Sequence, residues 1–221
     1  MKYIEKRSQP YDLNNWIRNK PNLCYDNITK KRKKFIRKKL LEDQGYICCY
    51  CQKRITGIRK DNKIDTEIEH IKPQEFCSDI ETVSYDNILV SCNGNQLKDN
   101  QFLVEQDRHC NNFRQSKALN INLLNNNCEN KIYYDLNGGI YAVDNNQDIE
   151  DAIINLNLRI LNTTRKAYIN GFFTEEILAT LDYNDLIKYE EYFSNKYEED
   201  DKQMYREYAG IMMNILNQFR L

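Results

Sequence analysis

Residues 46–51 read Tyr-Ile-Cys-Cys-Tyr-Cys, and Cys48 and Cys51 within this stretch form a CxxC pair. A CxxC knuckle turns two thiolates toward one point, where they can supply half of a tetrahedral Zn²⁺ site. The chain contains eight cysteines, and six of them fall between residues 48 and 110. Under reducing conditions such a set favours metal binding over disulfides. We therefore expect a structural zinc centre here, with buried free cysteines as the simpler alternative.

The second pair of zinc ligands is expected to be Cys92 and Cys110. These two cysteines are separated by 17 residues, so they do not form another CxxC motif. Cys77 remains an alternative member of this pair. Cys49 lies inside the knuckle and is expected to point away from the metal.

Downstream of the knuckle, Glu69 and His70 lie near the end of a strand predicted over residues 64–71. Imidazole can take a proton from water near neutral pH, and Mg²⁺ prefers oxygen ligands such as a carboxylate. Neighbouring residues on a strand point to opposite sides, so one can serve the metal and the other the water. By itself this pair is a weak indication of phosphodiester hydrolysis.

The order of the motifs is more informative. The CxxC pair is followed by TEIEHIKPQ at residues 66–74, YDNILVSC at 85–92 and HCNNFRQSK at 109–117. In this order the sequence resembles the HNH endonuclease family, which has the ββα-metal fold, and more narrowly the PtuB-like nucleases of retron and Septu anti-phage systems. The resemblance covers most of residues 1–170 and also includes MKYIEKRSQP (1–10), LLEDQGYICCYCQKRI (40–55) and INLNLRILNTTRKAYI (154–169).

The resemblance implies a role for each residue that matches the motif. His70 would be the general base, Asn87 would orient it, and Glu69 and Asn111 would bind Mg²⁺ or another divalent cation. The long spacer before Cys110 leaves the helix register open, so His109 and Asn112 remain alternatives to Asn111. The implied substrate is nucleic acid, with DNA favoured. The implied partners are a PtuA-type ATPase and a larger complex with a retron reverse transcriptase and its nucleic acid.

A basic helix is predicted upstream of the knuckle, capped by Thr29, running to about Asp43 and closed by Gly45. Eight of the ten positions from 30 to 39 are Lys or Arg. This face could cover phosphates or be merely solvated. The residues expected to contact nucleic acid are Lys30, Lys31, Arg32, Lys33, Lys34, Arg37 and Lys38.

Charge is distributed unevenly along the chain. Residues 1–140 carry 24 Lys and Arg against 18 Asp and Glu, a net charge of +6. Residues 141–221 carry 8 against 15, a net charge of −7. The basic part is suited to a polyanion, and the acidic part is the candidate surface for the ATPase.

The expected fold is α+β in three parts. Residues 1–45 hold a lead-in and the basic helix, residues 46–120 a zinc-stabilised ββα-metal HNH core, and residues 121–221 a hairpin and a mostly α-helical region. No apolar run approaches the roughly 18 residues of a membrane span, and the first residues lack a secretory pattern, so we expect a cytoplasmic protein without a membrane partner. The alternative function is a non-catalytic, zinc-stabilised module that binds nucleic acid or protein.

Overall fold

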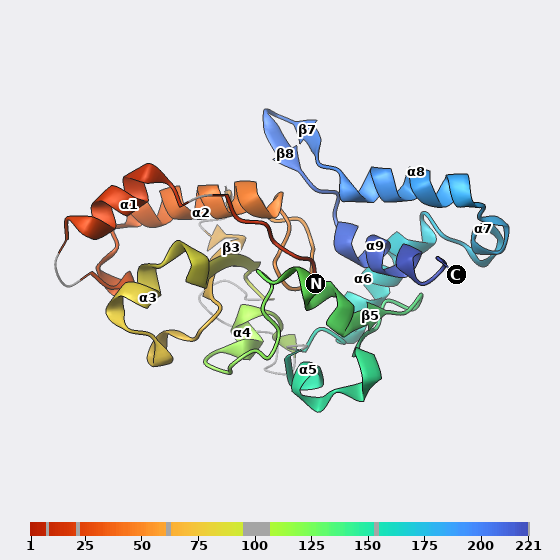
Figure 1. The fold of residues 1–221 in the computed structure, drawn as a ribbon, viewed down its shortest axis with the longest axis horizontal. Helices are drawn as coiled ribbons and strands as arrows, with labels where there is room; N and C mark the ends of the chain where they lie inside the picture. The colour runs from red at the N-terminus through yellow and green to blue at the C-terminus, as the bar shows by residue number, and fades with distance from the viewer. Residues whose placement is uncertain (8, 21–22, 61–62, 95–106, 153–154, 221) are drawn as a thin grey trace.

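The computed structural model describes residues 1–7, 9–20, 23–60, 63–94, 107–152 and 155–220. The molecule is elongated in Figure 1, with the zinc-knuckle half on one side and the C-terminal helices on the other. The amino terminus lies near the middle, where the two halves meet. The mixed α and β character agrees with the predicted class. No helix within the described ranges is long and apolar enough to cross a membrane.

The predicted basic helix is α2 (Lys30–Gln44), which lies beside α1 (Tyr11–Arg18) in Figure 1. The side chain of Thr29 caps α2 by accepting a hydrogen bond from the Arg32 amide at 3.3 Å. Gly45 ends the helix at φ 59°, and a Cβ there would lie 2.4 Å from the Tyr205 ring. The predicted cap, end and buried face of this helix are confirmed; the buried apolar residues are Ile36, Leu40 and Leu41.

An antiparallel pair of strands, β3 (Thr66–His70) and β4 (Ile88–Cys92), forms the centre of the knuckle half. In its register Thr66 faces Cys92 and His70 faces Ile88. The strands predicted near residues 64–71 and 87–91 are therefore present. Gln44 fixes α2 to this pair, because its side chain accepts from the Val90 amide at 2.7 Å and donates to the Val90 carbonyl at 2.8 Å.

Short elements surround the central strands. Ile47 forms an isolated bridge with Arg54, so the knuckle is a tight turn entered by a single bridge rather than by a full strand. The chain segment between β3 and β4 contains short helices, and a small hairpin precedes β3. The hairpin is β1 (Arg59–Lys60) and β2 (Lys63–Ile64), and the helices are η2 (Gln74–Phe76), α3 (Asp79–Val83) and η3 (Tyr85–Asn87). One further short helix, η1 (Tyr25–Asn27), lies between α1 and α2.

The sequence from Cys110 to about Leu119 also predicts a helix, but helix α4 (Asn111–Arg114) is much shorter. Cys110 at φ 54° and Gln115 at φ 51° are left-handed, and a right-handed helix cannot pass through such residues. The prediction of a loop over residues 93–108 falls mostly outside the described residues.

The C-terminal part begins with the predicted hairpin, formed by β5 (Ile132–Tyr134) and β6 (Ile140–Ala142). The run of acidic residues at 198–201 also predicts an exposed turn between helices. It instead forms the tip of a second hairpin, which projects at the top of Figure 1. The remaining elements are η6 (Asn126–Lys131), η7 (Val143–Asn145), α5 (Gln147–Ala152), α6 (Arg159–Asn170), α7 (Glu175–Thr180), α8 (Tyr183–Ser194), β7 (Tyr197–Glu199), β8 (Lys202–Met204) and α9 (Ala209–Asn217).

Helix α9 is part of the core of the C-terminal part. It is mostly apolar, with Ile211, Met212, Ile215 and Leu216 at most 1% exposed. It packs against α8 and β5. The C-terminal apolar stripe is therefore core rather than a free partner surface.

Candidate functional site

Four buried thiols meet in the knuckle half. The Sγ atoms of Cys48, Cys51, Cys92 and Cys110 all lie within 4.8 Å of one another. Cys48 and Cys110 are 3.9 Å apart, and Cys51 and Cys92 are 3.7 Å apart. A tetrahedral site with Zn–S bonds of about 2.3 Å has sulfur atoms about 3.8 Å apart, so the cluster fits Zn²⁺. The predicted four-cysteine set is confirmed as a cluster that could hold zinc.

Local backbone geometry brings these distant cysteines together. The Cys92 amide at the end of β4 donates to the Cys48 sulfur at 3.2 Å, as backbone amides commonly do around thiolate sites. Just beyond, Gly94 has φ 56°, and a Cβ there would lie 2.2 Å from the His109 carbonyl oxygen. Only glycine allows this close approach, which places the residue before Cys110 against the end of β4.

The other cysteine candidates lie outside the cluster. Cys77 is half-buried, and its sulfur lies 3.3 Å from the Lys72 carbonyl oxygen. Cys49 is buried within the knuckle but does not join the four thiols. Burial raises the pKa of the Cys110 thiol well above its ordinary value, because a thiolate loses its hydration there. A bound Zn²⁺ would supply the positive charge that stabilises the thiolates.

A separate cavity of about 230 Å³ lies beside this cluster and is lined by Glu69, His70 and Asn111. The other two candidates for the Asn111 position face elsewhere. The ring of His109 lies 3.1 Å from the Cys110 sulfur, and the side chain of Asn112 donates to the Asn93 carbonyl at 2.5 Å. Of the three alternatives, Asn111 is the residue that shares a cavity with Glu69 and His70.

Glu69 is 2% exposed and is held by two donors. The Tyr50 hydroxyl donates to its Oε1 atom at 2.7 Å, and the guanidinium of Arg114 forms a buried ion pair with the same oxygen. Burial raises the pKa of the Glu69 carboxyl, and Arg114 and Tyr50 oppose part of that rise. No sequence pattern predicted this ion pair, although Arg114 falls three residues after the predicted ligand Asn111.

His70 is 7% exposed, and its Nε2 atom lies 2.9 Å from the Thr82 carbonyl oxygen. A carbonyl oxygen only accepts, so Nε2 carries a proton in this hydrogen bond and Nδ1 of the neutral ring is the unprotonated nitrogen. The Tyr25 ring packs edge-on against the imidazole, with ring centroids 4.8 Å apart. Burial lowers the pKa of His70, which favours the neutral ring.

Asn87 braces the segment between β3 and β4. Its side-chain oxygen accepts from the Lys72 amide at 2.8 Å, and its nitrogen donates to the Glu81 carbonyl at 3.1 Å. These bonds tie the two ends of this segment together, next to Thr82. The hydrogen bonds of the Asn87 side chain are with this segment, and the His70 ring is hydrogen-bonded to the Thr82 carbonyl of the same segment.

Asn111 has a partner that the sequence analysis did not identify. Its side-chain nitrogen donates to the Glu67 carboxylate at 2.8 Å. Glu67 lies two residues before Glu69 and so points to the same face of β3. The two-residue spacing of Glu67 and Glu69 on a predicted strand is the sequence feature that could have identified Glu67. Because the bond uses the amide nitrogen of Asn111, the amide oxygen is the atom that can bind a cation.

Among the predicted nucleic-acid contacts, Lys33 lies close to this site. Its Nζ atom lies 3.9 Å from the centroid of the Tyr25 ring, the same ring that packs against His70. Arg32 instead lies over Trp16, with its guanidinium carbon 4.4 Å from the ring centroid. Of the remaining predicted contacts, Lys30, Lys31, Lys34 and Lys38 are exposed and Arg37 is half-buried.

No protein-family model matches this chain, and no curated protein matches it either. The assignment of function therefore depends on the geometry of the thiol cluster and of the cavity beside it.

Proposed function

We propose that this protein is a metal-dependent HNH-type endonuclease that hydrolyses phosphodiester bonds, with DNA as the favoured substrate. The observation that carries the proposal is the shared cavity of Glu69, His70 and Asn111 next to four clustered thiols. The chain order β3, β4, α4, with residues of β3 and α4 lining that cavity, supports a ββα-metal core.

His70 is the proposed general base. With the Nε2 proton donated to the Thr82 carbonyl, Nδ1 can take a proton from a water molecule in the cavity. The water oxygen then attacks the phosphorus atom in line with the leaving oxygen. Asn87 keeps the Thr82 carbonyl in place through its bonds to Lys72 and Glu81, so it is a positioning residue.

Glu69 and Asn111 are the proposed ligands of a divalent cation such as Mg²⁺. The donor set fits, because a carboxylate and an amide oxygen are the hard ligands this cation prefers. When bound, the cation would neutralise charge on the scissile phosphate and on the leaving oxygen. Arg114 lies at the same cavity and adds a fixed positive charge beside Glu69. The Asn111 bond to Glu67 uses the amide nitrogen and so leaves the amide oxygen available to the cation.

The zinc centre is proposed to be structural. Four thiolates complete a tetrahedron and leave no position for water or substrate. The cluster joins the knuckle, the end of β4 and the residue before α4, so it fixes Asn111 relative to His70. Lys33 and the exposed cations of α2 are proposed to contact the phosphates on the Tyr25 side of His70.

One observation favours the alternative of a non-catalytic zinc-stabilised binding module. The ion pair with Arg114 already occupies the carboxylate that the nuclease needs for its cation. A nuclease assay separates the two functions. Wild type, His70→Ala and Glu69→Gln are incubated with plasmid DNA, single-stranded DNA and RNA, with Mg²⁺ or with EDTA. Glu176→Gln, an exposed change on α7, is the matched control.

The nuclease predicts that wild type and Glu176→Gln cleave nucleic acid and need Mg²⁺ to do so. It also predicts that the cleavage rate falls by about 100-fold or more in both site variants. The binding module predicts that wild type binds nucleic acid but does not cleave it, with or without its partner. It also predicts that His70→Ala binds as wild type does.

The resemblance also supports a role in anti-phage defence, with a PtuA-type ATPase as partner and a retron reverse transcriptase in a larger complex. The acidic tip of the β7–β8 hairpin is the proposed ATPase contact, because its carboxylates disfavour nucleic acid. Co-purification of the full chain with the ATPase tests this. Glu198→Lys with Glu199→Lys is expected to reduce recovery of the ATPase, and undiminished recovery would contradict the proposed contact.

A further inference from the structure

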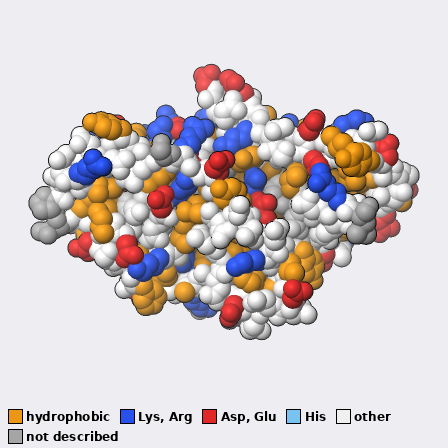
Figure 2. All heavy atoms as spheres, in the orientation of Figure 1, with side chains coloured by type: hydrophobic (Ala, Val, Ile, Leu, Met, Phe, Trp, Pro, Cys, Tyr) orange, Lys and Arg blue, Asp and Glu red, His pale blue; other side chains and the backbone are white. Residues whose placement is uncertain are grey.

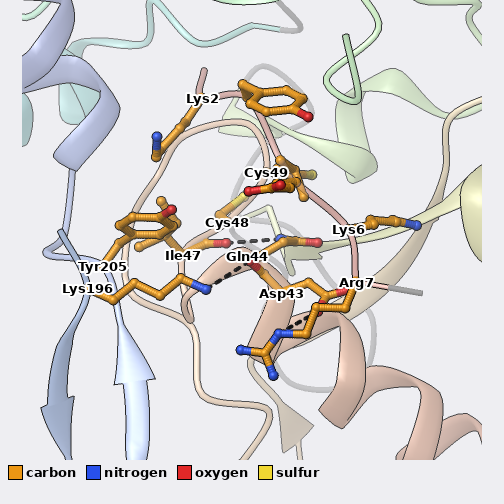
Figure 3. Close-up of a pocket in the computed structure, with 13 residues that line it drawn as sticks. Lys2, Lys6, Arg7, Asp43, Gln44, Ile47, Cys48, Cys49, Lys196 and Tyr205 are labelled. Atoms are coloured by element: carbon orange, nitrogen blue, oxygen red, sulfur yellow. Dashed lines mark hydrogen bonds and ion pairs between the residues drawn. The ribbon is translucent and has the colours of Figure 1, made fainter. Parts of the chain in front are cut away.

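A second cavity, of about 320 Å³, lies on another side of the zinc knuckle (Figure 3). Four segments meet there: residues 2–7, the end of α2, the knuckle residues 47–49, and the base of the β7–β8 hairpin. Lys196 precedes that hairpin and Tyr205 follows it. Cavities of roughly 300 Å³ and above are of the size that holds small ligands.

Cations converge on this cavity from separate segments. The Nζ atoms of Lys2 and Lys196 lie 4.8 Å and 5.0 Å from the centroid of the Tyr205 ring. Arg7 enters from the other side, next to Asp43, as Figure 3 shows. The pKa of Lys196 is lowered, first by burial and then by the positive charges of Arg7 and Lys2. This mutual repulsion is what an incoming anion would relieve.

The negative groups at the cavity do not balance these cations. Asp43 is 3.7 Å from Arg7 but also accepts a hydrogen bond from the Tyr85 hydroxyl at 2.8 Å. The Lys2 amine has a long ion pair, 3.8 Å, with Glu129 outside the cavity. Lys6 also lines the cavity, but its amine donates to the Tyr85 and Ile88 carbonyls and burial lowers its pKa to about 7. The cations that remain are Lys2, Arg7 and Lys196, against the carboxylates of Glu5 and Asp43.

We propose that this cavity binds a nucleoside phosphate, with its phosphate group held by Lys2, Arg7 and Lys196. Lysine and arginine form strong charge-assisted hydrogen bonds with phosphate oxygens. The Tyr205 ring, Ile4 and Ile47 line the same cavity and provide apolar surface for a base. The inference does not depend on the proposed nuclease, because binding can be measured without cleavage.

A small anion fits this cavity better than a nucleic-acid strand. The hairpin whose base forms one wall carries four consecutive carboxylates at its tip, Glu198, Glu199, Asp200 and Asp201. The tip is the acidic projection at the top of Figure 2. A long polyanion crossing this surface would meet those carboxylates, whereas a mononucleotide within the cavity would be largely screened from them.

Titration calorimetry on the full-length, zinc-loaded protein tests the proposal with ADP, pyrophosphate, adenosine and a single-stranded oligonucleotide. ADP is expected to bind most tightly, pyrophosphate more weakly, and adenosine not detectably. Lys2→Gln with Lys196→Gln should weaken ADP binding by at least about tenfold, since two charge-assisted contacts are lost. Lys188→Gln, which removes an exposed charge on α8, is the control and should leave binding unchanged.

Thermal unfolding and zinc content of each variant establish that it is folded. Arg7→Gln provides a second variant, because the Arg7 side chain is 65% exposed and can be replaced with little change in packing. ADP binding that is equally tight in all variants, or absent from wild type, overturns the site. Equal affinity for ADP and pyrophosphate overturns the nucleoside assignment. A larger effect of the double variant on the oligonucleotide than on ADP shows a nucleic-acid surface instead.

Discussion

The guanidinium of Arg114 forms an ion pair with the carboxylate of Glu69, and both side chains are at most 2% exposed. The same guanidinium donates to the His70 carbonyl, and to the Ile71 carbonyl at 2.6 Å. One side chain from α4 therefore holds the end of β3 in place. This explains how a helix of four residues can keep a fixed position relative to the strand that carries Glu69 and His70.

Replacing Arg114 is expected to destabilise the protein strongly. Arg114→Ala leaves the Glu69 carboxylate buried without its counter-charge, which should lower the free energy of unfolding by about 3–5 kcal/mol. Chemical denaturation measures the change. Lys188→Ala, which removes an exposed ion pair with Asp185, is the control and should cost at most about 1 kcal/mol. A similar small loss for Arg114→Ala would show that the pair does not hold α4 to β3.

Cys51→Ser is expected to remove zinc and stability together. The four thiols form one cluster, so losing one ligand should reduce the zinc content, which elemental analysis measures. It should also lower the free energy of unfolding by several kcal/mol, on the order of the contribution of a structural zinc. Cys24→Ser, at a half-buried cysteine outside the cluster, should retain both. Wild-type protein purified without any zinc would contradict this prediction.

Asn87→Ala is expected to loosen the segment between β3 and β4. The variant loses the side-chain bonds to Lys72 and Glu81, which should cost about 1–3 kcal/mol and speed amide exchange near Thr82. If the proposed cleavage occurs, its rate should fall with this loss of order around His70. Asn120→Ala, at an exposed amide, is the control. Unchanged exchange in residues 71–86 would argue against a bracing role.

Lys33→Ala is expected to weaken nucleic-acid binding more than Lys39→Ala does. Lys33 lies over the Tyr25 ring beside His70, whereas Lys39 is paired with Glu42 at 2.9 Å. In a plot of log K for duplex DNA binding against log salt concentration, the loss of one phosphate contact should reduce the magnitude of the slope by about 0.9. Fluorescence anisotropy over a range of salt concentrations measures this slope. Identical slopes for the two variants would exclude a specific phosphate contact by Lys33.

The sequence determined the local features of this protein. Thr29 and Gly45 fixed the ends of α2, because capping and a left-handed C-terminus depend on the residues themselves. The β5–β6 hairpin followed from its Gly-rich turn. The CxxC spacing identified half of the thiol cluster, and the motif order indicated which later cysteines complete it.

Only the tertiary structure decided the contacts between distant segments. It placed Asn111, rather than His109 or Asn112, at the cavity of Glu69 and His70, because the left-handed residue Cys110 turns the chain into α4. It paired Glu69 with Arg114 and gathered the cations of the second cavity from two distant segments, residues 2–7 and the base of the β7–β8 hairpin. Spacing along a chain records local geometry, whereas burial and charge pairing depend on which segments pack together, and no local pattern encodes that.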